Sequence, residues 1–239
     1  MKKMMRLGAL MMVLLAAGGI PVMGQDAGRE KSVEESYRET MEMMIIREQS
    51  RADSLEMKFI ALEYIESAIE KGNTGPDVLG ALEYLALEGI LNTIRENNRI
   101  TNNYPEVRRR AVQYLGNVGT PEAKSLLIRL IRTDKEPMIL QEAVKALGKI
   151  GSNDNNETVN AITGIIDRKY HLNQPDNLLA FSALDAYDKI AKTNGGLNDP
   201  LAVQTIISIV EGNYSPTVRN RAKQVLKNLR EYSSAGNSR

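Results

Sequence analysis

The sequence of 239 residues contains no cysteine, no tryptophan and a single histidine, His171. Without cysteine there is no disulfide framework, no thiolate nucleophile and no cysteine-based zinc site. One histidine alone does not make a usual zinc site, so we expect His171 to cap a helix end or to lie exposed. No serine stands in a readable arrangement with a base and a third orienting group. We therefore predict that the protein is not an enzyme and has no catalytic residue, no metal and no cofactor.

An excess of one charge is also missing, because 31 basic residues stand against 30 acidic ones. This balance gives no overall attraction to nucleic acid. Aromatic residues make up only 5% of the chain, and alternating runs of β-branched residues are absent. These features disfavour sheets and predict an all-α fold.

Residues 1–24 differ from the rest of the chain. "MKKMMR" carries three positive charges, the apolar run "LGALMMVLLAAGGI" follows, and "PVMGQ" offers a cleavage point after Gly24. The apolar run is shorter than the roughly 20 residues that a membrane-spanning helix needs. The pattern predicts a cleaved bacterial signal peptide and a periplasmic protein that does not span the membrane, with a retained N-terminal anchor as the alternative. Cleavage would leave 28 basic against 30 acidic residues.

One phrase recurs along the remainder of the chain. "NYPEVRRRAVQYLG" begins at Asn103, and "NYSPTVRNRAKQVL" begins at Asn213. A further copy begins at Pro137 and a weaker one near Leu179, so the period is near 37 residues. The copies at Pro105, Pro137 and Pro216 have proline in the first turn, all copies have one apolar stripe, and in the copies at Pro105 and Pro137 a glycine follows, which is typical of an amphipathic helix that must pack on neighbours.

Second helices separate these copies, and we predict an α-α superhelix, or solenoid, of about five antiparallel helix pairs. The pairs are expected at about 32–71, 77–118, 121–150, 156–193 and 199–231. A linker at 25–31 precedes an N-terminal helical region of degenerate repeats at 32–104, the regular repeats fill 105–231, and a disordered tail is expected at 232–239. In the N-terminal region the segment 75–97 is expected to be helical throughout, and the first helix is expected to turn one stripe to the core: Val33, Tyr37, Met41, Met44 and Ile45.

"PEVRRRAVQYLGNVG", "PMILQEAVKALGKIG" and "PTVRNRAKQVL", with "TPEAKSLLIRLIRTD" between the first two, resemble HEAT repeats of the short bacterial type also called PBS-lyase-like. The resemblance implies a right-handed superhelix whose second helices line a concave face that binds other macromolecules. It also implies an Asp in the turn within a repeat and an Arg after the Val. Asp134 fits the first position, and Arg108 and Arg219 fit the second, whereas Leu140 replaces the Arg in the middle repeat. We expect Arg108 and Arg219 to be structural, with direct partner contact as the alternative.

Polar side chains at the outward positions of the recurring helix are our candidates for partner binding. They are Arg109, Arg110, Gln113, Gln141, Lys145, Asn220, Arg221 and Gln224. Residues 105–149 hold nine bases and five acids, whereas residues 30–70 hold five bases and eleven acids. The asymmetry predicts a groove for an acidic segment of a protein partner, with an ordinary solvated surface as the alternative. The acidic N-terminal pair of another copy would also fit, which leaves a homo-oligomer open.

Two further segments have plain structural interpretations. Residues 152–158, "SNDNNET", are rich in oxygen ligands but lack the glycine and glutamate of a calcium loop, so we expect a loop with a helix cap. Met41, Met43 and Met44 are interpreted as core filler and not as a copper site.

The sequence thus predicts a non-catalytic exported scaffold or adaptor that mediates protein–protein interactions in an envelope complex. An enzyme-assisting factor similar to lyase-like HEAT proteins is one alternative. A nucleic-acid-binding helical-repeat protein is another, which the leader and the acidic balance of the mature chain oppose.

Overall fold

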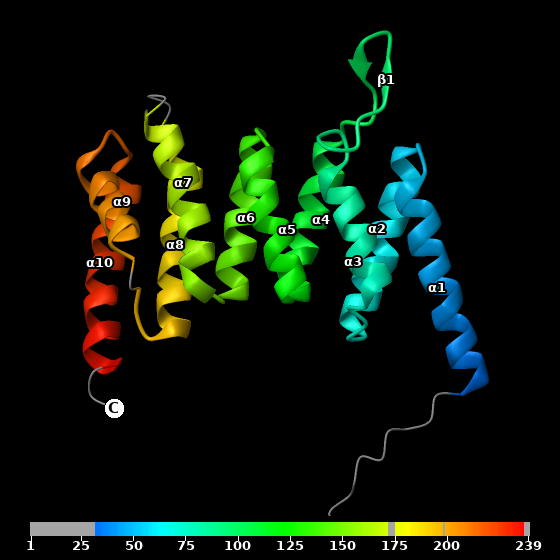
Figure 1. Cartoon of the computed structure of the whole chain (residues 1–239), viewed down its shortest axis with the longest axis horizontal. Helices are drawn as coiled ribbons and strands as arrows, with labels where there is room; N and C mark the ends of the chain where they lie inside the picture. The colour runs from blue at the N-terminus through cyan, green and yellow to red at the C-terminus, as the bar shows by residue number, and fades with distance from the viewer. Residues whose placement is uncertain (1–31, 172–174, 198, 237–239) are drawn as a thin grey trace, which may run out of the picture.

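The computed structural model describes residues 32–171, 175–197 and 199–236, and in these residues the chain forms ten α-helices stacked in pairs along one axis (Figure 1). The helices are α1 Val33–Arg51, α2 Leu55–Glu70, α3 Pro76–Leu87, α4 Pro105–Val118, α5 Pro121–Thr133, α6 Pro137–Ile150, α7 Glu157–His171, α8 Asn177–Asn194, α9 Pro200–Glu211 and α10 Pro216–Gly236. Odd-numbered helices pack on one another in one layer and even-numbered helices in a second layer. This arrangement confirms the predicted all-α solenoid. In the described ranges, no helix combines the length and the apolar character that a bilayer span requires.

Local capping chemistry sets the helix boundaries of the regular repeats. Proline occupies the first turn of α4, α5, α6, α9 and α10, where its missing N–H costs no hydrogen bond. The Thr120 hydroxyl accepts from the Ala123 N–H, and the Asp199 carboxylate accepts from the Leu201 N–H at 2.8 Å. Gly119 and Gly151 end α4 and α6 with φ of 68° and 74°, a left-handed conformation that favours glycine.

A second pair of glycines, inside the helices, sets how closely the even-numbered helices approach. A Cβ added to Gly116 would lie 2.8 Å from the Ala146 Cβ, and one added to Gly148 would lie 2.7 Å from the Ala186 Cα. Because the second contact is to backbone, no rotamer change relieves it. The Leu-Gly step of the recurring phrase is therefore a packing device that brings α4, α6 and α8 together.

The predicted helix at 75–97 is wrong beyond Leu87. The chain leaves α3 there and forms a hairpin of strands β1 Arg95–Glu96 and β2 Arg99–Ile100 before α4 begins. Asn97 and Asn98 form its tip with positive φ, which asparagine tolerates better than most residues. The hairpin projects from the upper edge of the stack in Figure 1. The Asn97-Asn98 pair was the sequence signal for this turn.

The predicted core stripe of α1 is also wrong in part. Ile46 and Ser50 are the buried residues of this helix, whereas Val33, Tyr37 and Met44 are exposed. Met43 packs against the core as expected of filler, but Met44 does not. The error arises because α1 has apolar residues on both sides, and only packing shows which side faces α2 and α3.

Of residues 152–158, the first five form a loop with a short 3-10 turn, η1 Asp154–Asn156, and the last two begin α7. The Asn153 side chain caps α7 by accepting from the Val159 N–H at 3.1 Å. Helix α10 extends to Gly236, into the segment predicted to be disordered. The signal peptide at 1–24, the linker at 25–31 and the side chain of His171 lie outside the described residues.

Candidate partner-binding groove

An open groove of about 370 Å³ runs across the even-numbered layer over α4, α6 and α8. Its floor consists of small residues: Gly116, Ala146, Ser182 and Ala186. Its walls are longer polar side chains: Gln113, Asn117, Glu142, Lys145, Lys149, Asp185 and Lys189. The groove follows from the close packing described above, because the small residues that let the helices approach leave a floor without long side chains.

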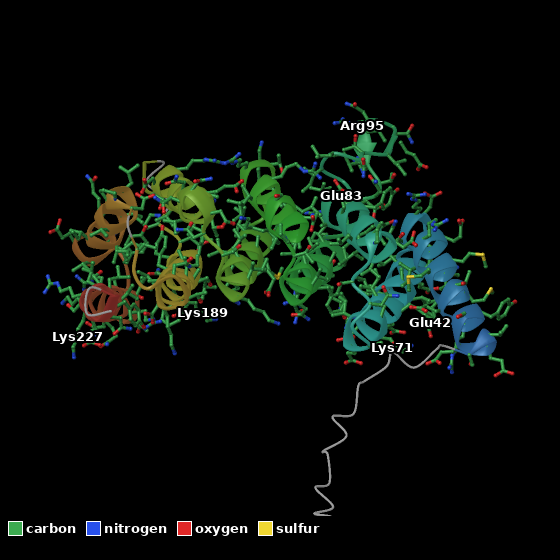
Figure 2. The ribbon with its side chains drawn as sticks, turned by 60° about the horizontal axis from the view of Figure 1, so that its bottom comes forward. Glu42, Lys71, Glu83, Arg95, Lys189 and Lys227 are labelled. Atoms are coloured by element: carbon green, nitrogen blue, oxygen red, sulfur yellow. The ribbon has the colours of Figure 1, made fainter. Side chains whose placement is uncertain are left out.

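The walls of the groove carry an excess of positive charge. Lys149 Nζ donates to Asn117 Oδ1 at 2.6 Å, and Lys145 Nζ lies 3.9 Å from Glu142 Oε2. The Asp185 carboxylate is engaged by the Arg221 guanidinium at 2.7 Å. Three lysines thus face two carboxylates, one of which already has an arginine partner. Lys189, labelled in Figure 2, is exposed.

The structure brings two of the eight predicted partner-binding residues into this groove, Gln113 and Lys145. Arg109 and Arg110 are exposed on α4 beside it, and the Arg110 guanidinium lies over the Phe59 ring at 5.6 Å from the ring centre. Gln141 is half-buried on α6. The other three residues lie on α10, outside the groove lining.

On α10, Asn220 and Gln224 are exposed, and Gln224 donates to Asn228 Oδ1 at 2.8 Å. Arg221 binds Asp185 and Asp188 on α8, so its guanidinium holds two helices together. Lys149 and Lys189 were not among the predicted residues. Lys149 lies one helical turn beyond Lys145, so helical periodicity was the available signal, whereas Lys189 lies on α8, where no residue was predicted.

Of the two arginines expected to be structural, Arg108 has that role, whereas Arg219 is exposed on α10. Arg108 is buried, its Nε donates to Asp134 Oδ2 at 3.3 Å, and its Nη1 donates to Asn103 Oδ1 and, at 3.4 Å, to the Glu88 carbonyl. The other carboxylate oxygen of Asp134 accepts two backbone N–H groups of the turn before α6, at 2.7 and 2.9 Å. Leu140 is buried at the equivalent position of α6, so this pairing stops there.

A second buried ion pair, which the sequence analysis missed, joins Lys58 of α2 to Glu88 at the end of α3. Lys58 Nζ lies 2.7 Å from Glu88 Oε1, and both side chains are almost fully buried. "ALEYI" after Lys58 parallels "AVQYL" after Arg108, so the two cations hold equivalent positions in successive repeats. The N-terminal region, which was predicted to hold degenerate repeats, therefore keeps the buried cation of the regular repeat.

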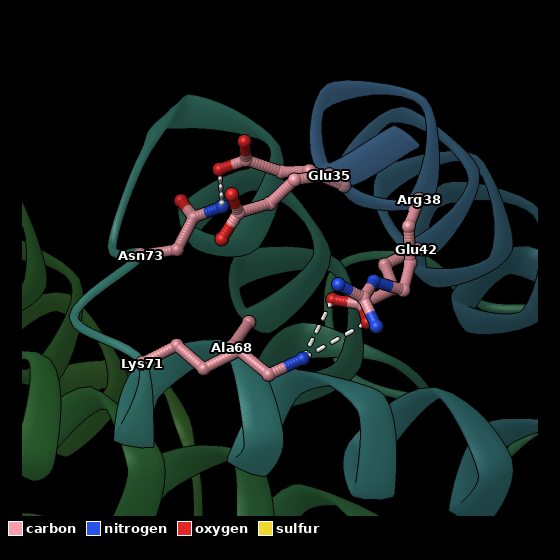
Figure 3. A pocket seen from close by; sticks show the side chains of 7 residues that line it. Glu35, Arg38, Glu42, Ala68, Lys71 and Asn73 are labelled. Carbon is pink, nitrogen blue, oxygen red and sulfur yellow. Dashed lines mark hydrogen bonds and ion pairs between the residues drawn. The ribbon is translucent and has the colours of Figure 1, made fainter. Parts of the chain in front are cut away.

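Two other depressions are less suited to binding a charged partner. The one in Figure 3, about 400 Å³ between α1 and α2, pairs its charges internally, with Lys71 Nζ at 2.9 Å from Glu42 Oε1. A cleft of about 830 Å³ between α3 and α5 has an apolar floor at Leu79 and Leu126 and is bridged by an Arg129–Glu83 ion pair. Among the described residues, no group of histidine, aspartate or glutamate is arranged to hold a metal ion.

The stacked helix pairs define an α-solenoid, and the sequence match identifies its kind. Residues 98–171 match the family model described as HEAT repeats, so this part of the chain consists of HEAT repeats. Repeats of this family generally form non-catalytic helical scaffolds and usually mediate protein interactions. The finer assignment to the short bacterial, PBS-lyase-like type stays a prediction.

The other comparisons add little. No curated protein matches the chain at a significant level. One similar solved structure is a de novo designed 16-helix transmembrane nanopore, at 14% identity and a TM-score of 0.23, covering 85% of this chain and 64% of the designed one.

Proposed function

We propose that the protein is an exported HEAT-repeat scaffold of the bacterial periplasm that binds an acidic segment of a partner protein in the groove over α4, α6 and α8. The observation that carries the proposal is the positioning of Lys145, Lys149 and Lys189 around a floor of small residues. An extended segment could lie on such a floor, with its carboxylates reaching the lysines on either side.

The same groove favours a peptide over a nucleic acid. Glu142 and Asp185 lie on the same walls as the lysines. A continuous phosphate backbone would approach both carboxylates, whereas a protein segment can present acidic, neutral and donor groups in turn. Affinity would come from contacts spread over three helices and not from one deep pocket.

Charge reversal in the groove tests the binding role. A variant with Lys145→Glu, Lys149→Glu and Lys189→Glu is expected to recover its partner from cell-envelope extract at least about tenfold less well than the wild type, as mass spectrometry would measure. The control reverses the same number of charges on the α5 and α7 side, with Arg132→Glu, Lys135→Glu and Arg168→Glu. Equal loss in both variants, or no loss in the groove variant, would contradict the proposal.

Export is tested separately. We expect the cellular protein to occur in the periplasmic fraction and to begin at Gln25, as intact-mass measurement would show. A protein that keeps Met1 and fractionates with the cytoplasm would contradict export without bearing on the groove.

A further inference from the structure

Helix α1 has apolar residues on both of its sides. Met43 and Ile46 face the core, whereas Val33, Tyr37 and Met44 are 88%, 68% and 47% exposed on the other side. A helix that is apolar on both sides is normally covered on both, and the terminal repeat of a soluble solenoid normally has a polar outer face. Helix α1 therefore resembles an internal helix of the stack whose outer neighbour is missing.

Acidic residues flank this outer face of α1. Glu34 lies three residues before Tyr37, and Glu48 lies four residues after Met44, so both lie on the same side of the helix. The helix as a whole contains five acidic and three basic residues. The end of the stack formed by α1 is thus apolar at its centre, with more acidic than basic residues around it.

The opposite end of the stack has the complementary charge. Helix α10 contains five basic residues and one acidic residue. Its side toward α8 carries Arg221, Asn228 and Tyr232, which all contact Asp188. On the other side an exposed basic ridge follows the helix at spacings of four, four and three residues: Arg219, Lys223, Lys227 and Arg230.

We propose that copies of this protein stack head to tail, with the basic ridge of α10 docked on the outer face of α1 in the next copy. Lysine and arginine suit this surface because their aliphatic stems cover apolar side chains while their charged ends reach nearby carboxylates. Tyr37 offers a ring face for a cation as well. Helices α1 and α10 lie at opposite ends of the stack in Figure 1, so the contact joins two molecules.

The contact is heterologous, because each copy contributes a different surface and keeps one free end. It therefore joins copies into an open chain or a ring and does not form a twofold dimer. Since it involves one helix from each copy and several exposed charges, we expect weak association that declines as salt is raised.

Sedimentation velocity on the full mature chain over a range of concentrations tests the proposal. The wild type is expected to associate at low salt. A head variant, Glu34→Lys with Glu48→Lys, and a tail variant, Lys223→Glu with Arg230→Glu, are each expected to weaken self-association at least about tenfold. Each variant alone has like charges at its two ends.

The decisive experiment is sedimentation velocity on a mixture of the head and tail variants. One end of each variant is native and the other reversed, so every contact between the two kinds of molecule again joins opposite charges, and we expect association to return. The control with Arg132→Glu and Lys135→Glu makes the same charge change as the tail variant and should associate like the wild type. The groove variant should also associate normally, which separates this proposal from the one on partner binding.

Three outcomes would overturn head-to-tail stacking. They are a wild type that stays monomeric at every concentration, a tail variant that associates as well as the wild type, and a mixture of head and tail variants that stays monomeric. Circular dichroism verifies that the variants are folded, which is expected because every altered side chain is exposed.

Discussion

The N-terminal half of the stack is held by buried charges, whereas its centre is held by glycine–alanine contacts. Lys58 and Arg108 both bind Glu88, where α3 ends and the non-helical segment 88–104 begins. After α4 the described turns within and between helix pairs are short, and Gly116 and Gly148 allow close apolar packing instead. The two N-terminal cations thus lie where a long non-helical segment must be fixed, since Arg108 satisfies the backbone carbonyl of Glu88 and Lys58 binds its carboxylate.

The largest expected effect comes from breaking the N-terminal ion pair. Lys58→Met should lower the free energy of unfolding by about 3–5 kcal/mol, because the buried Glu88 carboxylate would lose its partner and folding would require it to take up a proton. Replacing both residues, with Lys58→Met and Glu88→Met, should recover most of this loss. Urea unfolding measures both, and a double variant as unstable as the single one would contradict the explanation.

The same variant has a predictable pH dependence. Burial is the main reason why the pKa of Glu88 lies above its ordinary value, and the Lys58 ammonium group opposes that shift. Without Lys58 only the protonated form is tolerated. Because a raised pKa in the folded state favours folding at low pH, the instability of Lys58→Met should diminish as the pH falls from neutral toward the ordinary carboxyl value of 4.5.

An intermediate effect is expected in the glycine-packed centre. Gly148→Ala should cost about 1–3 kcal/mol, because the added Cβ meets the backbone of α8 at Ala186. Gly164→Ala is the matched control, since nothing lies within 4 Å of a Cβ there and alanine favours a helix by about 0.8–1 kcal/mol over glycine. Opposite signs in thermal unfolding are the expected result, and destabilisation by both would contradict the packing role.

A smaller effect is expected where α8 meets α10. Asp188 accepts from Arg221, Asn228 and Tyr232, but this cluster is partly exposed, so its bonds are screened by water. Asp188→Ala should cost about 1–2 kcal/mol and should speed amide hydrogen exchange mainly in α10. Lys192→Ala, on the exposed surface of α8, is the control. Faster exchange spread evenly over α4 to α10 would contradict a local role.

The smallest effect near neutral pH is expected from two buried tyrosines. Burial, together with Glu66, raises the pKa of Tyr114 to about 12, and burial also raises that of Tyr187, which hydrogen-bonds Thr163 at 2.9 Å. Stability should therefore be level below pH 10 and should fall above it, because the unfolded chain ionises first. Tyr114→Phe should make this fall shallower. An unchanged alkaline midpoint would contradict the assignment.

Part of the candidate site could be predicted from the sequence and part could not. The outward positions Gln113 and Lys145 follow from helical periodicity, and both line the groove. Arg221 occupies an equivalent outward position in its helix, but it is engaged by Asp185 and Asp188. Periodicity states which side of a helix a residue occupies, whereas its availability depends on the side chains that the neighbouring helix presents.

The helix class, the repeat and most helix boundaries follow from local sequence, because proline, capping side chains and left-handed glycines act within a few residues. The buried side of α1, the end of α3 and the pairing of Lys58 with Glu88 follow only from the folded arrangement. These outcomes depend on groups far apart in the chain, whose desolvation and packing energies arise only when the helices are assembled.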